Sequence, residues 1–114
     1  MIALKTLDKG PFHEINRKYS QKLIFDSDPC VYYYGFYNND KMIGYSKIKV
    51  LWEKGKVILE DFYLEDVFPL TTFFLKATGL KVYNLGFDRL YNQSDFLGDW
   101  EKIIVLEELF SLSI

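Results

Sequence analysis

The chain has 114 residues, the size of one domain, and we expect residues 1–114 to fold as a single unit. Of these residues 49% are hydrophobic, 26% are charged and 18% are aromatic, which is typical of a globular protein with a well-filled core. The formal net charge is −2 and the Lys and Arg residues are scattered, so a nucleic-acid-binding surface is not expected.

The chain has one cysteine, Cys30, and one histidine, His13. A single cysteine cannot form an internal disulfide bond, which favours the reducing cytoplasm, and one Cys with one His cannot supply a zinc site. The N-terminus lacks a charged segment followed by an apolar stretch, so it does not predict a signal peptide. No apolar run reaches the roughly 18 residues of a membrane-spanning helix. We therefore expect a cytoplasmic protein with no metal and no membrane partner.

The first elements are a strand and a helix. Loose alternation of apolar and polar residues predicts a strand at residues 2–7, and residues 8–11 contain the Gly-Pro pair of a turn. Apolar residues spaced three or four apart predict a helix over residues 12–25. Pro29 follows closely, and the residue before a proline disfavours helical geometry, so the helix ends before it.

Three strands follow as an antiparallel meander. β-branched and aromatic residues predict strands at residues 31–37 and 42–52, joined by the turn at residues 38–40. Residues 53–55 end in Gly55 and predict a second tight turn into a strand at residues 56–64.

The rest of the chain predicts shorter elements. Apolar spacing from residue 70 indicates a helix that ends at Gly79 as a C-cap. Residues 80–87 then predict a strand, residues 89–91 a short helix and residues 102–106 another strand. Residues 109–114 form either one more edge strand or an ordered tail.

Several segments, in their order along the chain, resemble the GNAT superfamily of acyl-CoA N-acyltransferases. Leu59-Glu60-Asp61-Phe62-Tyr63 resembles its central strand, especially that of diamine acetyltransferases. Residues 37–45 resemble the family's hairpin, residues 77–83 its next helix end, glycine and strand, and residues 90–96 its late F/L-Y-x-x-x-G-F segment. The resemblance implies an α+β fold, a mixed and mostly antiparallel sheet flanked by helices, in the order β-α-β-β-β-α-β-α-β.

The chain departs from the family after the central strand, where an R/Q-x-x-G-x-G/A loop normally presents backbone N–H groups to the CoA pyrophosphate. The matching positions are degenerate and hold no Gly or Arg: Asp66, Val67, Phe68, Leu70 and Thr71. Pro69 has no N–H, and Glu65 and Asp66 add negative charge. Losing three hydrogen bonds to phosphate would remove about 5–9 kcal/mol, whereas micromolar binding amounts to about 8 kcal/mol. Asp66 is alternatively a helix N-cap.

Glu60 and Tyr91 are the candidate catalytic residues. The resemblance places Glu60 on the strand that lines the substrate cleft, as a general base. Strand alternation puts it on one side with Ile58, Phe62 and Leu64, where a carboxylate needs a partner or a function. The alternative is an ion pair with a lysine of the adjacent strand. Tyr91 resembles the tyrosine that protonates the departing thiolate, and the alternative is an aromatic residue that covers the core.

These observations predict a divergent GNAT-like protein that has lost ordinary acetyl-CoA-dependent transfer. It would bind a small molecule or a protein through the remaining cleft, with no assured cofactor. The alternative is an active N-acetyltransferase that acts on an amine and holds acetyl-CoA through an unconventional loop. A third expectation is a homodimer formed through a C-terminal edge strand, because residues 103–106 and 109–114 are largely apolar.

Overall fold

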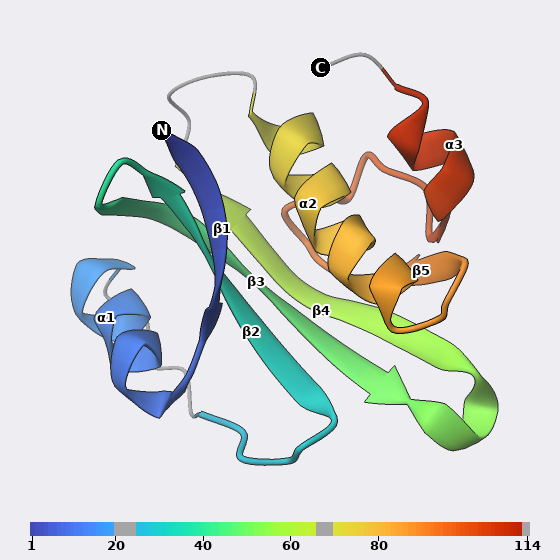
Figure 1. The fold of residues 1–114 in the computed structure, drawn as a ribbon, viewed down its shortest axis with the longest axis horizontal. Coiled ribbons are helices and arrows are strands. Elements are labelled where there is room, and N and C mark those ends of the chain that lie inside the picture. The colour runs from blue at the N-terminus through green and yellow to red at the C-terminus, as the bar shows by residue number, and fades with distance from the viewer. Residues whose placement is uncertain (20–24, 66–69, 113–114) are drawn as a thin grey trace.

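The structure is a computed structural model that describes residues 1–19, 25–65 and 70–112. Its elements in chain order are β1 (Ile2–Leu7), α1 (Lys9–Tyr19), β2 (Val31–Asn38), β3 (Lys41–Leu51), a 3-10 turn (Trp52–Lys54), β4 (Lys56–Leu64), α2 (Thr71–Asn84), β5 (Arg89–Asn92), β6 (Ile103–Val105) and α3 (Leu106–Phe110). The six strands form one sheet in chain order, with α1 packed on one face and α2 and α3 on the other (Figure 1). All neighbouring strands are antiparallel except β4 and β5, which are parallel. The predicted class, an α+β fold with a mixed, mostly antiparallel sheet, is confirmed.

The predicted meander is also confirmed, and the bounds of β2, β3 and β4 differ from the expected ranges by one residue at most. The turns on either side of β3 contain residues with left-handed backbone geometry, Asn39 (φ 57°) and Gly55 (φ 61°). Asn and Gly are the residue types that adopt this geometry at least cost. The local sequence therefore specifies both connections.

The first helix begins earlier than predicted. α1 starts at Lys9, so residues 8–11 form its first turn rather than a separate turn, and the Phe12 N–H donates to the Asp8 carbonyl (3.0 Å). Pro11 is compatible with this position because the first N–H groups of a helix have no partner inside the helix. Phe25 is not helical, which corrects the predicted end, and residues 20–24 lie outside the described residues.

The second helix does not end at Gly79, and the strand predicted for residues 80–87 is wrong. α2 continues to Asn84. A Cβ at Gly79 would lie 3.1 Å from methyl groups of Leu106 and Leu109, so this glycine allows α3 to approach α2 closely. The C-terminal glycine of α2 is Gly86 (φ 100°), whose N–H donates to the Tyr83 carbonyl (2.9 Å), the geometry of a Schellman motif.

The chain after α2 differs most from the expectation. The predicted helix at residues 89–91 is the strand β5, and the predicted strand at residues 102–106 is confirmed as β6. α3 occupies part of the predicted tail, so an edge strand is wrong for the described residues 109–112. The observed order is therefore β-α-β-β-β-α-β-β-α.

Two hydrophobic clusters lie on opposite faces of the sheet. The larger one joins α2 and α3 to the sheet, and the Phe36 and Phe74 rings stack in it at 4.3 Å. It also buries a hydrogen bond between the hydroxyls of Ser46 and Thr78 (3.1 Å). The smaller cluster, under α1, includes Phe12, Ile15 and several tyrosines. Aromatic residues thus fill both faces, as the composition predicted.

Candidate functional site

A bulge in β4 sets the direction of its side chains. Lys47 of β3 lies opposite Asp61, whereas the next residue, Ile48, lies opposite Leu59, so Glu60 is an extra residue in the ladder. Bulges of this kind redirect side chains near functional sites. Phe62 lies in the cluster under α2, so the expected common side for Glu60 and Phe62 is not observed.

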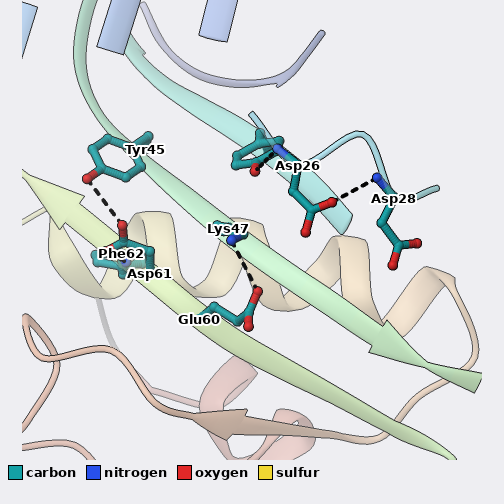
Figure 2. A network of polar contacts seen from close by, with 8 residues as sticks. Asp26, Asp28, Tyr45, Lys47, Glu60, Asp61 and Phe62 are labelled. Carbon is teal, nitrogen blue, oxygen red and sulfur yellow. Dashed lines mark hydrogen bonds and ion pairs between the residues drawn. The ribbon is translucent and has the colours of Figure 1, made fainter. Parts of the chain in front are cut away.

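Glu60 forms an ion pair with Lys47 from the adjacent strand. The Lys47 Nζ lies 3.4 Å from the Glu60 carboxylate (Figure 2) and 5.8 Å from the centre of the Tyr33 ring, which belongs to the cluster under α1. About a third or less of each charged side chain is exposed. The contact is the lysine pairing considered as the alternative for Glu60, and partly exposed pairs of this kind contribute about 1 kcal/mol or less.

Asp61, like Glu60, is a partly buried carboxylate. It accepts hydrogen bonds from the Tyr45 hydroxyl (3.3 Å) and from the Phe62 N–H (2.9 Å), and Figure 2 shows both partners beside it. Burial raises the pKa of Asp61 above its usual value, and the negative charge of Asp95 adds to this. The two hydrogen bonds and the positive charge of Lys47 oppose the rise but do not cancel it.

Three tyrosines form a cluster on the α1 side of the sheet, and one of them, Tyr45, contacts the Asp61 carboxylate. The rings of Tyr19, Tyr45 and Tyr63 lie 5.0–6.2 Å apart, centre to centre. The Tyr19 hydroxyl donates to Glu65 (3.0 Å), and Lys18 pairs with the same carboxylate (3.4 Å). Burial raises the pKa of Tyr19, and the hydrogen bond to Glu65 raises it further.

We call this group the tyrosine–carboxylate site. Its aromatic members are Tyr19, Tyr45 and Tyr63, its carboxylates are Glu60, Asp61, Glu65 and Asp95, and its cations are Lys18 and Lys47. The four carboxylates outnumber the two ammonium groups, so the site carries excess negative charge beside aromatic faces. That combination suits a cationic ligand.

The opening between the parallel strands β4 and β5 is bridged by the chain itself. The two strands pair only at Ile58 with Tyr91 and at Leu59 with Asn92, while β4 continues to Leu64. Beyond the pairing, residues 93–97, which we call the bridging segment, run beside β4. The segment makes these contacts: the Gln93 N–H donates to the Leu59 carbonyl (3.0 Å), the Ser94 hydroxyl to the Phe62 carbonyl (3.5 Å), and the Phe96 ring lies 5.8 Å from those of Phe62 and Tyr63.

The side chain of Asn92 holds the bridging segment in place. It is buried, its amide donates to the Leu97 carbonyl (2.9 Å), and its oxygen accepts from the Ser94 N–H (3.1 Å). These bonds fix both ends of the segment against the end of β5. Ser94 and Leu97 are buried and anchor the segment to the sheet, while Gln93, Asp95 and Phe96 are exposed.

The structure gives Tyr91 and Glu60 separate lysine partners. Tyr91 lies opposite Ile58, two residues before Glu60, and the Lys56 Nζ sits 4.4 Å from the centre of its ring. Their catalytic roles stay predictions.

Of the five expected loop positions, Asp66, Val67 and Phe68 lie outside the described residues, as does the N-cap interpretation of Asp66. Leu70 immediately precedes α2 and Thr71 is its first residue, with no side-chain hydrogen bond from Leu70 to cap the helix.

The sequence interpretation missed Asp61 as a site residue and the cluster of Tyr19, Tyr45 and Tyr63. One signal was present, because tyrosine and charged residues occupy alternate positions on β3 (Tyr45, Lys47) and on β4 (Asp61, Tyr63) and so mark a second face of the sheet. In the described part of the chain, no three His, Cys, Asp or Glu side chains are grouped to hold a metal ion. None of the helices described is long and apolar enough to cross a membrane.

No protein-family model matches the chain, and no curated protein matches it. Solved structures of acetyltransferases do match its fold. An N-acetyltransferase from Staphylococcus aureus Mu50 has a TM-score of 0.61 at 14% identity, over 81% of this chain and 70% of that one. An aminoglycoside acetyltransferase from an uncultured soil metagenomic sample, in complex with trehalose, has 0.60 at 16% identity, over 86% and 80%. A probable acetyltransferase from Staphylococcus epidermidis has 0.57 at 12% identity, over 81% and 72%. The chain therefore has a GNAT-like acetyltransferase fold.

Proposed function

We propose that this chain is a ligand-binding domain built on an acetyltransferase fold, and that it does not carry out ordinary acetyl-CoA-dependent transfer. Its ligand is a positively charged small molecule or protein segment, held at the tyrosine–carboxylate site. Acetyl-CoA is not part of this function.

The bridging segment is the observation that carries the proposal. It uses backbone groups of β4 that face the opening, namely the carbonyls of Leu59 and Phe62, which accept hydrogen bonds from Gln93 and Ser94. The Phe62 N–H is also taken, because it donates to the Asp61 carboxylate. An extended ligand that paired with β4 would have to replace these bonds, each worth roughly 0.5–1.5 kcal/mol net. The opening is thus poorly suited to a long donor such as an acyl-CoA.

The charge of the site supports a cationic ligand. An ammonium group could lie at Asp61, whose carboxylate accepts from the Tyr45 hydroxyl, or at Glu65, whose carboxylate accepts from the Tyr19 hydroxyl. Aromatic faces attract cations, and the attraction grows when water is excluded. An anionic ligand would instead meet the excess of carboxylates.

Isothermal titration with acetyl-CoA and then with free CoA tests the absence of donor binding. We expect no saturable heat at concentrations of up to about 1 mM, which corresponds to binding weaker than about −4 kcal/mol. Micromolar binding of either compound would overturn this part of the proposal.

Titration with 1,4-diaminobutane tests the ligand class, and 1,4-butanediol is the matched neutral control. We expect saturable binding of the diamine alone, weakened by added salt because the attraction is electrostatic. Asp61→Asn keeps the shape of the site but removes a charge, so it should reduce the affinity severalfold. Equal binding of the diol and the diamine would contradict a cation site.

One observation favours a second function, an active N-acetyltransferase that acts on an amine. Asp61 is a partly buried carboxylate with a raised pKa, a feature of general bases, whereas Glu60 is paired with Lys47. An assay of free thiol release from acetyl-CoA with a diamine would detect this function. If Asp61 is the general base, Asp61→Asn should abolish turnover and Glu60→Gln should retain it.

A further inference from the structure

One row of side chains crosses β3, β4, β5 and β6 without an apolar cover. The residues in register along it are Lys49, Ile58, Tyr91 and Ile103. Val31 lies opposite Lys49 and belongs to the cluster under α1, so the row is on the α1 side of the sheet. However, α1 packs at the β1 end of the sheet, away from β5 (Figure 1). The apolar and aromatic members of the row belong to neither hydrophobic cluster.

Three cations lie on this part of the sheet. Lys49 is in the row itself, and Lys56 and Arg89 each lie two residues before a member of the row, so they share its face. The Lys56 Nζ sits 4.4 Å from the centre of the Tyr91 ring. We call the following six residues the cationic face: Lys49, Lys56, Ile58, Arg89, Tyr91 and Ile103.

The cations of this face have few counter-charges. Within the described part of the chain, neither Lys49 nor Lys56 forms an ion pair, and Arg89 pairs with Asp88, its neighbour in sequence (3.8 Å). More than half of each side chain of the Arg89 pair is exposed, so this contact neutralises little of the charge. The face therefore carries excess positive charge.

Carboxylates on neighbouring segments are already engaged. Glu60, the next charged residue on β4, is paired with a lysine. In the turn before β2, Asp26 accepts a hydrogen bond from the Asp28 N–H, and Asp28 accepts one from the Cys30 N–H (2.9 Å each). The missing negative charge would thus come from a partner.

The chemistry of the cationic face selects a protein segment that is both acidic and apolar. Its cations attract carboxylates, while Ile58 and the 44% exposed Ile103 favour apolar side chains. A nucleic acid fits less well, because Tyr91 is the one aromatic residue of the face and Lys56 already lies over its ring, where a base would stack.

The position of the face in the sheet selects a helix. β3, β4 and β5 each have a neighbour on both sides, so a partner cannot add to them as another strand. A sheet face that offers side chains alone is normally covered by a helix, as α2 covers the opposite face here. Strands about 4.8 Å apart make the row roughly 14 Å long, which a helix of about ten residues spans.

We propose that the cationic face binds an amphipathic helix of another protein, in which acidic residues flank an apolar stripe. The described helices of a second copy do not fit, because exposed Arg17 on α1 and Lys81 on α2 would be repelled and α3 has only five residues. The inference goes beyond the proposed function and is independent of it, since no residue of the cationic face belongs to the tyrosine–carboxylate site.

Fluorescence anisotropy with a synthetic helical peptide of about 15 residues tests this proposal. Leucines at helical spacing form its apolar stripe and glutamates flank them, and the matched control peptide has glutamine in place of every glutamate. We expect saturable binding of the acidic peptide that salt weakens, and binding of the glutamine peptide that is weaker by about tenfold or more. No binding of the acidic peptide, equal binding of both peptides, or tighter binding of single-stranded oligothymidylate would overturn the proposal.

Lys56→Glu and Ile103→Glu test the location of the binding surface. Each places a carboxylate on the cationic face and should weaken binding of the acidic peptide by about tenfold or more. Ile103 is exposed, so Ile103→Glu decides the test should Lys56→Glu fold poorly. The matched controls, Lys81→Glu and Leu80→Glu, make the same changes at exposed positions of α2 and should bind as wild type does. Binding that survives both face variants, or that the α2 variants lose equally, would contradict the proposal.

Discussion

Asp61 is the residue on which the chemistry of the candidate site depends. It has two hydrogen-bond donors, Tyr45 and Phe62, yet burial still raises its pKa. A carboxylate in this state attracts a cation strongly, because a bound positive charge restores the stabilisation that water no longer provides. Glu60, in contrast, already has Lys47 as its partner.

The raised pKa of Asp61 predicts how stability depends on pH. Just above the ordinary pKa of an aspartate, about 3.9, the folded chain keeps a proton on Asp61 that the unfolded chain has released. The contribution of Asp61 to the free energy of unfolding therefore falls as the pH rises through this window. Asp61→Asn cannot titrate, so the stability of wild type relative to the variant should decrease from about pH 4 upward.

Urea unfolding of wild type and Asp61→Asn at a series of pH values measures this difference directly. Using the difference removes the contributions of the other carboxylates, which both proteins share. A difference that is flat or that increases with pH would mean that the pKa of Asp61 is not raised by folding.

At the scale of elements, the meander positions the site through a close approach of β3 and β4. Gly44 lies opposite Leu64, and a Cβ at this glycine would come within 2.2 Å of the Tyr63 carbonyl oxygen. A glycine is therefore required at this point if β4 is to keep Tyr63 and Asp61 in place.

Gly44→Ala should reduce the free energy of unfolding by roughly 1–3 kcal/mol, because backbone atoms of β4 must move to admit the methyl group. Gly10→Ala is the matched control. Its Cβ would have Asp8 as nearest neighbour at 3.7 Å, and alanine favours α1, so we expect a gain of about 0.5–1 kcal/mol. Chemical unfolding of both variants checks the contrast, and equal effects would contradict it.

The elements that the sequence predicted well are those with local signals. β2, β3 and β4 follow one another, and left-handed Asn39 and Gly55 mark their turns. The second half of the chain, from α2 onward, lacks such local signals. α2 is apolar around most of its circumference, so its helical periodicity is weak. Gly79 has the residue type of a C-cap, but it lies inside α2 where α3 makes close contact.

The site was harder to predict than the fold for a physical reason. The bulge at Glu60 shifts the alternation of β4 by one residue, which changes the face of every residue after it. The residue types of β4 do not predict that shift. The pairing of Glu60 with a lysine was nevertheless among the expected alternatives, whereas the contact of Asp61 with Tyr45 requires knowing the register.

At the scale of the whole molecule, the chain combines a fold that resembles acetyltransferases with a segment, residues 93–97, that bridges β4 and β5. The sheet, the parallel pair β4 and β5 and the flanking helices resemble acetyltransferases, at identities that speak for the fold alone. The difference proposed here is one short segment, residues 93–97, that lies beside β4 and uses its free backbone groups. In the function that we propose, the ligand binds instead at the tyrosine–carboxylate site on the α1 side.

An NMR titration of backbone amides tests this account most directly, because it locates binding as well as detecting it. The account predicts that 1,4-diaminobutane shifts the amide of Phe62, which donates to Asp61, in a saturable way. It predicts that acetyl-CoA leaves the amide of Gln93, bonded to Leu59 across the opening, unchanged. A saturable shift of Gln93 with acetyl-CoA, or no response of Phe62 to the diamine, would contradict it.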